Sequence, residues 1–209
     1  MEIDVWSDVV CPWCYVGRRK LQRALDESGL SDVVIRHRAF ELQPDAPVGV
    51  VAPTVERLAR KYGKTAEEVA EMQEYVIDAA ETVGLTFNLE DTLSGNTVDA
   101  HRLLLWANEH DGQDALLERM FAAYFTEGRS LFDAESLLAL VREAGLDEVD
   151  AAAVLTSDRY RDDVVSDERL AQELGANGVP FFVFDMKYGI SGAQPFEVFA
   201  QTIAQAAAG

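Results

Sequence analysis

The chain has 209 residues, of which 48% are hydrophobic, and a formal net charge of −19 at pH 7. This length and apolar content suffice for one large domain, or for a domain with a sizeable insertion, and argue against a disordered chain. The negative charge would repel nucleic acids and anionic membrane surfaces, so neither is expected as a partner. Because the acidic residues are spread along the chain, the simplest consequence of the charge is solubility.

The first part of the chain predicts a strand, a helix and a second strand. Residues 2–6 alternate as a strand does, and residues 12–27 follow as a helix with Gly29 beyond it as the cap. Residues 33–40 are rich in β-branched side chains and predict the second strand. A proline-rich break then extends to Pro53.

The middle of the chain is predicted to be a helical region. Thr54 opens a long helical stretch, and Thr65-Ala-Glu-Glu68 has the form of a capping box. After a polar connection at residues 88–95, apolar residues on several sides of residues 97–109 predict a buried helix. The remaining predicted helices are residues 115–125, 134–144, 147–155 and 160–174.

Strand patterns return only near the end, at residues 180–184 and 188–191, and a helix over residues 195–207 follows. The order is therefore β-α-β, a helical block, and then α-β-β-α. Strands from the two ends of the chain can complete one sheet, while the helical block packs as a lid.

The two cysteines of the chain form the motif Cys11-Pro12-Trp13-Cys14, between the first strand and the first helix. A helix N-terminus offers unpaired N–H groups and positive potential, which favour a thiolate. Cys11 is therefore the expected nucleophile, and Cys14, about one turn further along, can resolve a mixed disulfide. Pro12 suits the first helical position, and Trp13 would be an apolar surface residue able to touch substrate.

Other roles for the two cysteines are less favoured by the sequence. A structural disulfide would close a loop too short to restrict the unfolded chain strongly. A zinc site needs about four ligands, and the three histidines, His37, His101 and His110, lack the usual paired spacing. Two ordinary buried cysteines can also fall at this spacing.

The segment Gly178-Val179-Pro180 precedes the third predicted strand. A cis Val179–Pro180 bond would turn the Val179 peptide groups outward, where they could pair with an extended substrate beside Cys11. A trans proline that starts a strand is the commoner state, and the residues alone favour it.

Two acidic residues flank the cysteine motif in sequence. Asp4 or Asp8 could accept the proton of Cys14, and would also raise the thiol pKa of Cys11 by repulsion. An exposed charge at a strand end is the more ordinary role for both, and is the one we expect.

Asn96 and His101 lie at the start of the predicted buried helix. Asn96 could hydrogen-bond a substrate or serve as the helix cap, and the sequence favours neither role. His101 is expected to be a core or helix-surface residue rather than a base.

Four segments resemble the DsbA-like branch of the thioredoxin superfamily, and more narrowly its FrnE subgroup: residues 8–17, 96–103, 178–184 and 190–195. The resemblance implies an α/β, thioredoxin-like domain formed by residues 1–45 and 165–209, with a large all-helical insertion at residues 46–164. It implies Cys11 as the nucleophile, Cys14 as the resolving thiol, and a cis-proline loop at Val179 and Pro180 facing them. Substrate-binding roles would fall to Pro12, Trp13, Val179, Pro180 and Asn96.

A thiol–disulfide oxidoreductase is the activity that the resemblance implies. It needs no cofactor beyond the dithiol, although a small-molecule thiol could be a co-substrate. Secreted relatives have Pro-His between the cysteines where this chain has Pro12-Trp13, so the direction of electron flow is not carried over.

Two other functions are kept as alternatives. The first is a glutathione-dependent isomerase or transferase, of the 2-hydroxychromene-2-carboxylate isomerase or kappa-class type. In that group a serine typically replaces the first cysteine, whereas this chain has Cys11. The second is a non-enzymatic peptide-binding (holdase) module, whose function would survive loss of Cys11.

Location and partners are expected from the same features. The sequence shows no signal peptide and no apolar run long enough to span a bilayer, so we expect a cytoplasmic protein without membrane contacts. In a reducing compartment a CxxC pair is more often catalytic than structural. The expected substrate is a disulfide-containing protein or a small-molecule thiol, and the oligomeric state is left open, a dimer included.

Overall fold

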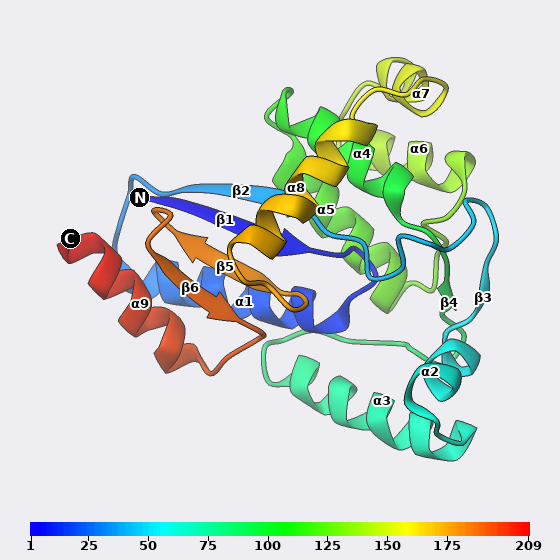
Figure 1. Ribbon diagram of the computed structural model, residues 1–209, viewed down its shortest axis with the longest axis horizontal. Coiled ribbons are helices and arrows are strands. Elements are labelled where there is room, and N and C mark those ends of the chain that lie inside the picture. The colour runs from blue at the N-terminus through cyan, green and yellow to red at the C-terminus, as the bar shows by residue number, and fades with distance from the viewer.

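A four-stranded sheet joins the two ends of the chain in the computed structural model, which describes residues 1–209 (Figure 1). Its strands are β1 (Glu2–Ser7), β2 (Val34–Ala39), β5 (Phe181–Phe184) and β6 (Tyr188–Ser191), in the order β2-β1-β5-β6. β1 is parallel to β2 and antiparallel to β5, and β5 is antiparallel to β6. The prediction that chain-distant strands complete one sheet is confirmed.

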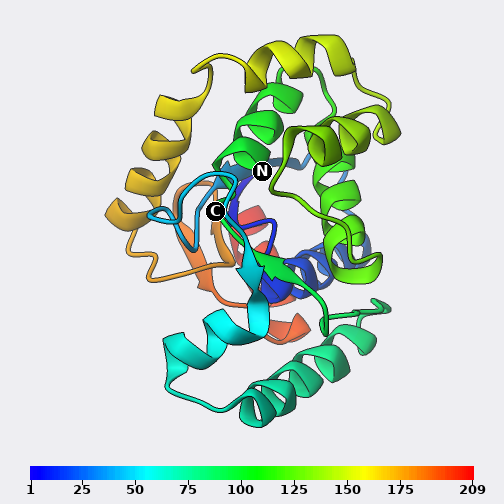
Figure 2. The ribbon, with the colours of Figure 1, turned by 90° about the vertical axis from the view of Figure 1, so that its right-hand side faces the viewer.

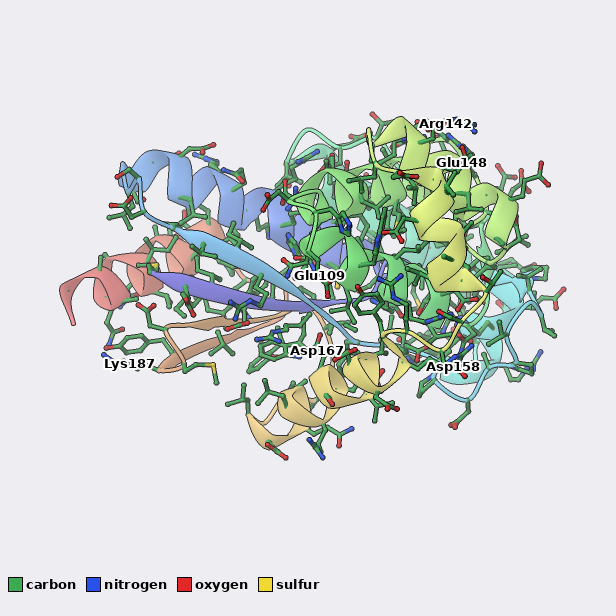
Figure 3. All side chains as sticks on the ribbon, turned by 90° about the horizontal axis from the view of Figure 1, so that it is seen from above. Glu109, Arg142, Glu148, Asp158, Asp167 and Lys187 are labelled. Atoms are coloured by element: carbon green, nitrogen blue, oxygen red, sulfur yellow. The ribbon has the colours of Figure 1, made fainter.

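Helices cover both faces of this sheet. Side chains of β1 and β5 alternate between the two faces, so each face carries apolar residues that a helix can bury. One face packs against α1 (Pro12–Ser28) and α9 (Phe196–Ala208), through a cluster that includes Ile3, Val5, Phe182, Phe184 and Phe199. The other face packs against α8 (Arg161–Glu173), through Trp6, Ala171, Phe181 and Val183. Asp167 of α8 (Figure 3) links this helix to β2. Its carboxylate accepts hydrogen bonds from Arg38 and from the Ala39 amide, each at 3.0 Å.

α1 begins directly after β1 and carries the cysteine motif in its first turn. Its buried stripe includes Leu21, Ala24 and Leu25, and it ends at Gly29, whose φ of 68° is the left-handed conformation that glycine adopts without strain. The predicted cap is therefore confirmed.

The middle of the chain is mainly helical. Its helices are α2 (Thr54–Tyr62), α3 (Ala66–Glu81), α4 (Val98–Asn108), α5 (Gln113–Phe121), a π-helical turn η1 (Ala122–Thr126), α6 (Ala134–Glu143) and α7 (Glu148–Leu155). Thr65 forms the predicted capping box with Glu68. The largest apolar cluster of the molecule joins this block to Cys11, Cys14 and Tyr15, so the cysteines lie where the two parts of the fold meet.

The helical block also contains two short strands that were not predicted. β3 (Ala52–Pro53) and β4 (Leu93–Ser94) pair antiparallel and connect the α2–α3 hairpin to the rest of the chain (Figure 2). The expectation that strands occur only at the two ends was wrong, because a two-residue pairing has no alternation to reveal it. None of the helices combines the length and the apolar content that a membrane span requires.

Candidate active site

Cys11 is the N-cap residue of α1, with φ −95° and ψ 110°, and Pro12 occupies the first helical position. The amide of Cys14 donates to the Cys11 carbonyl oxygen at 3.0 Å, which closes a tight turn around the motif. Both thiols are free, and their residues are only 5% and 3% exposed. The chain therefore places two neighbouring thiols in the first turn of a helix.

The loop before β5 lies against Cys11. The Cys11 thiol donates a hydrogen bond to the carbonyl oxygen of Val179, with 3.7 Å between sulfur and oxygen, and the Val179–Pro180 peptide bond is cis. Pairing of β5 with β1 brings this loop to the start of α1 from 168 residues away. Gly17 permits the close approach, because a Cβ there would meet Pro180 Cγ at 3.2 Å and Phe182 Cζ at 3.1 Å.

Cys14 is the less accessible thiol of the pair. Its burial raises its pKa well above the ordinary value, and the neighbouring Cys11 and the Asp8 carboxylate raise it further. Cys14 is therefore held as a thiol at neutral pH in the reduced protein.

A cavity of about 230 Å³ opens beside the motif. It is lined by Cys11, Pro12, Trp13 and Val179 on one side and by residues of α2 and α3 on the other, and Cys14 does not line it. The helical block thus forms a wall opposite Cys11, in agreement with the lid that was expected. Trp13 is half-buried and packs against Tyr75 of α3, with ring centroids 5.8 Å apart.

Behind the motif lies a buried polar cluster. Asp8 is 1% exposed; one oxygen accepts from the Leu42 amide at 2.7 Å, and the other lies 3.5 Å from His101 Nε2. Burial raises the pKa of Glu41 to about 7, and the nearby carboxylates Glu168 and Asp8 act in the same direction, against the charge of His101. Of this cluster, Asp8 is the group whose charge acts on Cys14.

The expectation that Asp4 and Asp8 are exposed was wrong. Asp4 is 4% exposed and accepts from Arg38 Nε at 2.8 Å. The partners of the two carboxylates come from β2, from the segment after it and from α4. Because these segments are distant in sequence, the residues near Asp4 and Asp8 did not indicate their burial. His101 is 2% exposed, so the prediction of a core position is confirmed.

Asn96 does not line the cavity. Its side-chain oxygen accepts from the Val98 amide at 3.0 Å, and its nitrogen donates to the Pro44 carbonyl at 3.4 Å. Of the two roles considered, these contacts correspond to organising the start of α4, although the N-cap residue itself is Thr97.

Sequence reasoning missed the residues that α2 contributes to the cavity, above all Arg57 and Lys61. The available signal in the sequence was the cluster of three cations, Arg57, Arg60 and Lys61, in an otherwise acidic chain. No group of three or more His, Cys, Asp or Glu side chains is arranged to hold a metal ion.

The sheet order, the covering helices and the dithiol at the start of α1 define a thioredoxin-like fold with a helical insertion. Residues 2–204 match the model of the DSBA-like thioredoxin domain, so the chain belongs to that family.

The chain is also similar to solved structures and to a curated relative. A probable DsbA oxidoreductase, SCO1869 from Streptomyces coelicolor, is 42% identical with a TM-score of 0.93, covering 100% of this chain and 90% of that one. DsbM from Pseudomonas aeruginosa, described as a cytosolic disulfide reductase, is 21% identical with a TM-score of 0.69, and both chains are covered completely. The uncharacterized protein YwbO of Bacillus subtilis (strain 168) is 27% identical, over 97% of this chain and 96% of its own.

Proposed function

We propose that the protein is a thiol–disulfide oxidoreductase in which Cys11 is the nucleophile and Cys14 the resolving thiol. One observation carries the assignment: of two neighbouring free cysteines, only Cys11 lines the cavity, whereas Cys14 is buried behind it. A substrate in the cavity can therefore reach one sulfur and not the other. The helix N-terminus at Cys11 favours the thiolate that exchange requires.

Reduction of a substrate proceeds in two steps. The Cys11 thiolate attacks one substrate sulfur, the substrate S–S bond breaks, and a mixed disulfide forms while the leaving sulfur takes up a proton. Cys14 then loses its proton, attacks the Cys11 sulfur and releases the second substrate thiol. The two electrons that reduce the substrate come from the dithiol, which is oxidised to the Cys11–Cys14 disulfide. The dithiol therefore takes the place of a separate cofactor. The reverse sequence oxidises a dithiol substrate.

Substrate contacts are assigned to the residues around Cys11. Trp13 and Pro12 form one edge of the cavity and Val179 another, and Pro180 positions the Val179 peptide group beside the sulfur. Either a disulfide-containing protein or a small thiol compound fits this arrangement, and the fold of DsbM has been solved with GSH. The same proposal places the protein in the cytoplasm, where a dithiol is kept reduced, and retains the FrnE subgroup as a prediction.

The test is disulfide exchange with a protein substrate, comparing the wild type with Cys11→Ser and Cys14→Ser. We expect Cys11→Ser to abolish exchange and Cys14→Ser to accumulate a mixed disulfide at Cys11, visible by mass spectrometry. Asn96→Ala, outside the cavity, is the control. Exchange that survives in Cys11→Ser would refute the assignment and turn attention to glutathione-dependent isomerisation or peptide binding.

A further inference from the structure

α2 carries three cations that have no acidic partner. Arg57, Arg60 and Lys61 take part in no ion pair, whereas every other arginine of the chain lies within 4.0 Å of a carboxylate. The chain has 37 acidic residues for 18 lysines and arginines, so acidic partners are abundant. The lack of a carboxylate within 4.0 Å distinguishes Arg57 and Arg60 from the other arginines of the chain.

Two of these cations face the site. Arg57 and Lys61 line the cavity of about 230 Å³ that contains Cys11, whereas Arg60 does not, and no aspartate or glutamate lines it. The Arg57 Nε is buried and has no hydrogen-bond partner within the protein. A buried donor without an acceptor is unfavourable, and an anion brought by a ligand would satisfy it.

We propose that Arg57 and Lys61 select disulfides that carry a carboxylate close to the reacting sulfur. The inference rests on the proposed exchange at Cys11 and specifies its substrate class. A guanidinium matches a carboxylate through two parallel hydrogen bonds, and Lys61 adds a second positive charge at the same wall. The cavity is smaller than the roughly 300–1,000 Å³ of pockets for drug-sized ligands, so it suits a small compound or one acidic side chain beside a peptide disulfide.

The chemistry is the exchange already described, with the carboxylate unchanged. Cys11 attacks the sulfur nearer the cavity while the carboxylate binds Arg57, and the departing thiol takes a proton from water. Cys14 then displaces the second thiol. One disulfide and the protein dithiol yield two thiols and the Cys11–Cys14 disulfide, so no further reductant is needed for a single turnover.

The experiment is single-turnover oxidation of the reduced protein by three small disulfides of different charge. The probes are 3,3′-dithiodipropionate (anionic), bis(2-hydroxyethyl) disulfide (neutral) and cystamine (cationic), with disulfide formation scored by alkylation and mass spectrometry. The measured quantity is the ratio of the anionic to the neutral rate. We expect the double variant Arg57→Gln, Lys61→Gln to lower this ratio roughly tenfold, as expected for loss of a charge-assisted contact, and to raise the relative rate of cystamine.

Two matched variants remove the same charge elsewhere. Arg60→Gln lies on the same helix but outside the cavity, and Lys187→Gln lies at the opposite end of the molecule (Figure 3). Both should leave the ratio within about twofold of the wild type. The neutral probe reports whether each variant has a folded, reactive dithiol, so a misfolded variant is recognised because it loses both the anionic and the neutral rate. If the double variant misfolds, Arg57→Lys is used in its place. Because Arg57→Lys keeps the positive charge, it should lower the ratio less.

Each outcome decides between the two proposals. A ratio that the double variant leaves unchanged, with the neutral rate retained, overturns the selection by Arg57 and Lys61 but not the oxidoreductase. Reaction with none of the three probes nor with peptides overturns both. Disulfide peptides with glutamate or glutamine beside the cysteine are tested in parallel, and a charge preference confined to them assigns the cations to protein substrates rather than small compounds.

Discussion

The Asp8 carboxylate lies 3.5 Å from the imidazole of His101, Oδ1 to Nε2, and both side chains are almost fully buried. Burial lowers the pKa of His101, but the Asp8 carboxylate, followed by Glu41 and Glu168, outweighs it and raises the pKa above its ordinary value. The pair lies behind the dithiol, and the Asp8 charge contributes to the raised pKa of Cys14. The site therefore places the buried Asp8–His101 pair beside the thiol that completes the exchange.

Asp8→Asn should lower the pKa of Cys14, because it removes a negative charge near a buried thiol. The burial of Cys14, which is the larger cause, stays in place, so the pKa should remain above its ordinary value. The measurement is the pH dependence of the Cys14 Cβ chemical shift in a Cys11→Ala background. Asp4→Asn, an equally buried carboxylate that pairs with Arg38, should leave that pKa unchanged; an unchanged Cys14 titration in Asp8→Asn would contradict the coupling.

Glu41→Gln should remove part of the pH dependence of stability. The pKa of Glu41 is about 7 in the folded protein, mainly because burial disfavours its charge, and about 4.3 in an unfolded chain. Between these values the folded state binds more protons, so the free energy of unfolding falls as the pH rises from about 4.3 to about 7. The variant should flatten this fall and be more stable than the wild type at pH 8, as measured by urea unfolding across the range.

Glu118→Gln should change the pH dependence of stability in the direction opposite to Glu41→Gln. Hydrogen bonds from Tyr15 and the charge of Arg19 outweigh burial and lower the pKa of Glu118. Its contribution to stability is present above the unfolded pKa and is lost as the pH falls, so Glu118→Gln should lose stability at pH 7. Equal slopes in both variants would show that neither carboxylate controls the profile.

Gly17→Ala should destabilise the protein and slow exchange. The new methyl group would push α1 away from Pro180 and Phe182, at a cost of about 1–3 kcal/mol for overpacking, offset by about 0.5–1 kcal/mol of improved helix propensity. Gly189→Ala is the control, because its nearest contact would be an ordinary 3.6 Å to Phe181. Urea unfolding and exchange rates are measured for both variants. Equal stability and equal rates in Gly17→Ala and Gly189→Ala would contradict the prediction.

Arg102→Met should be the most destabilising of these changes, by about 3–5 kcal/mol, because it breaks a buried charge network. Arg102 is fully buried; it pairs with Asp99 at 2.7 Å and donates to the Arg159 carbonyl at 2.8 Å and to those of Val154 and Ser157. Urea unfolding gives the loss directly. Arg161→Gln, at an exposed pair with Asp158, should change stability by less than about 0.5 kcal/mol.

Local signals predicted the parts of the fold that local physics controls. The capping box at Thr65, the left-handed cap at Gly29 and the strand after Pro180 each depend on neighbours within a few residues, and each is present. The pairing of β3 with β4 depends on a contact between Ala52 and Ser94, which no local pattern encodes.

The candidate site divides in the same way. Cys11 and Cys14 could be found because both lie in one motif, at a strand–helix junction that the sequence already indicates. The burial of Asp8 could not be predicted, because its partners Leu42 and His101 come from two other segments. Arg57 was missed since only the packing of α2 over the motif brings it to the cavity.

The small β3–β4 ladder has a consequence for how such a protein can diversify. It closes the chain on itself at Ala52 and Ser94, so the segment between them departs from and returns to one point of the scaffold. That segment carries Arg57 and Lys61, whereas Cys11 and Cys14 lie at the start of α1 and Pro180 lies directly before β5. Recognition and reactivity therefore occupy separable stretches of sequence, and an exchanged α2–α3 hairpin could redirect the choice of substrate while the dithiol chemistry is inherited intact.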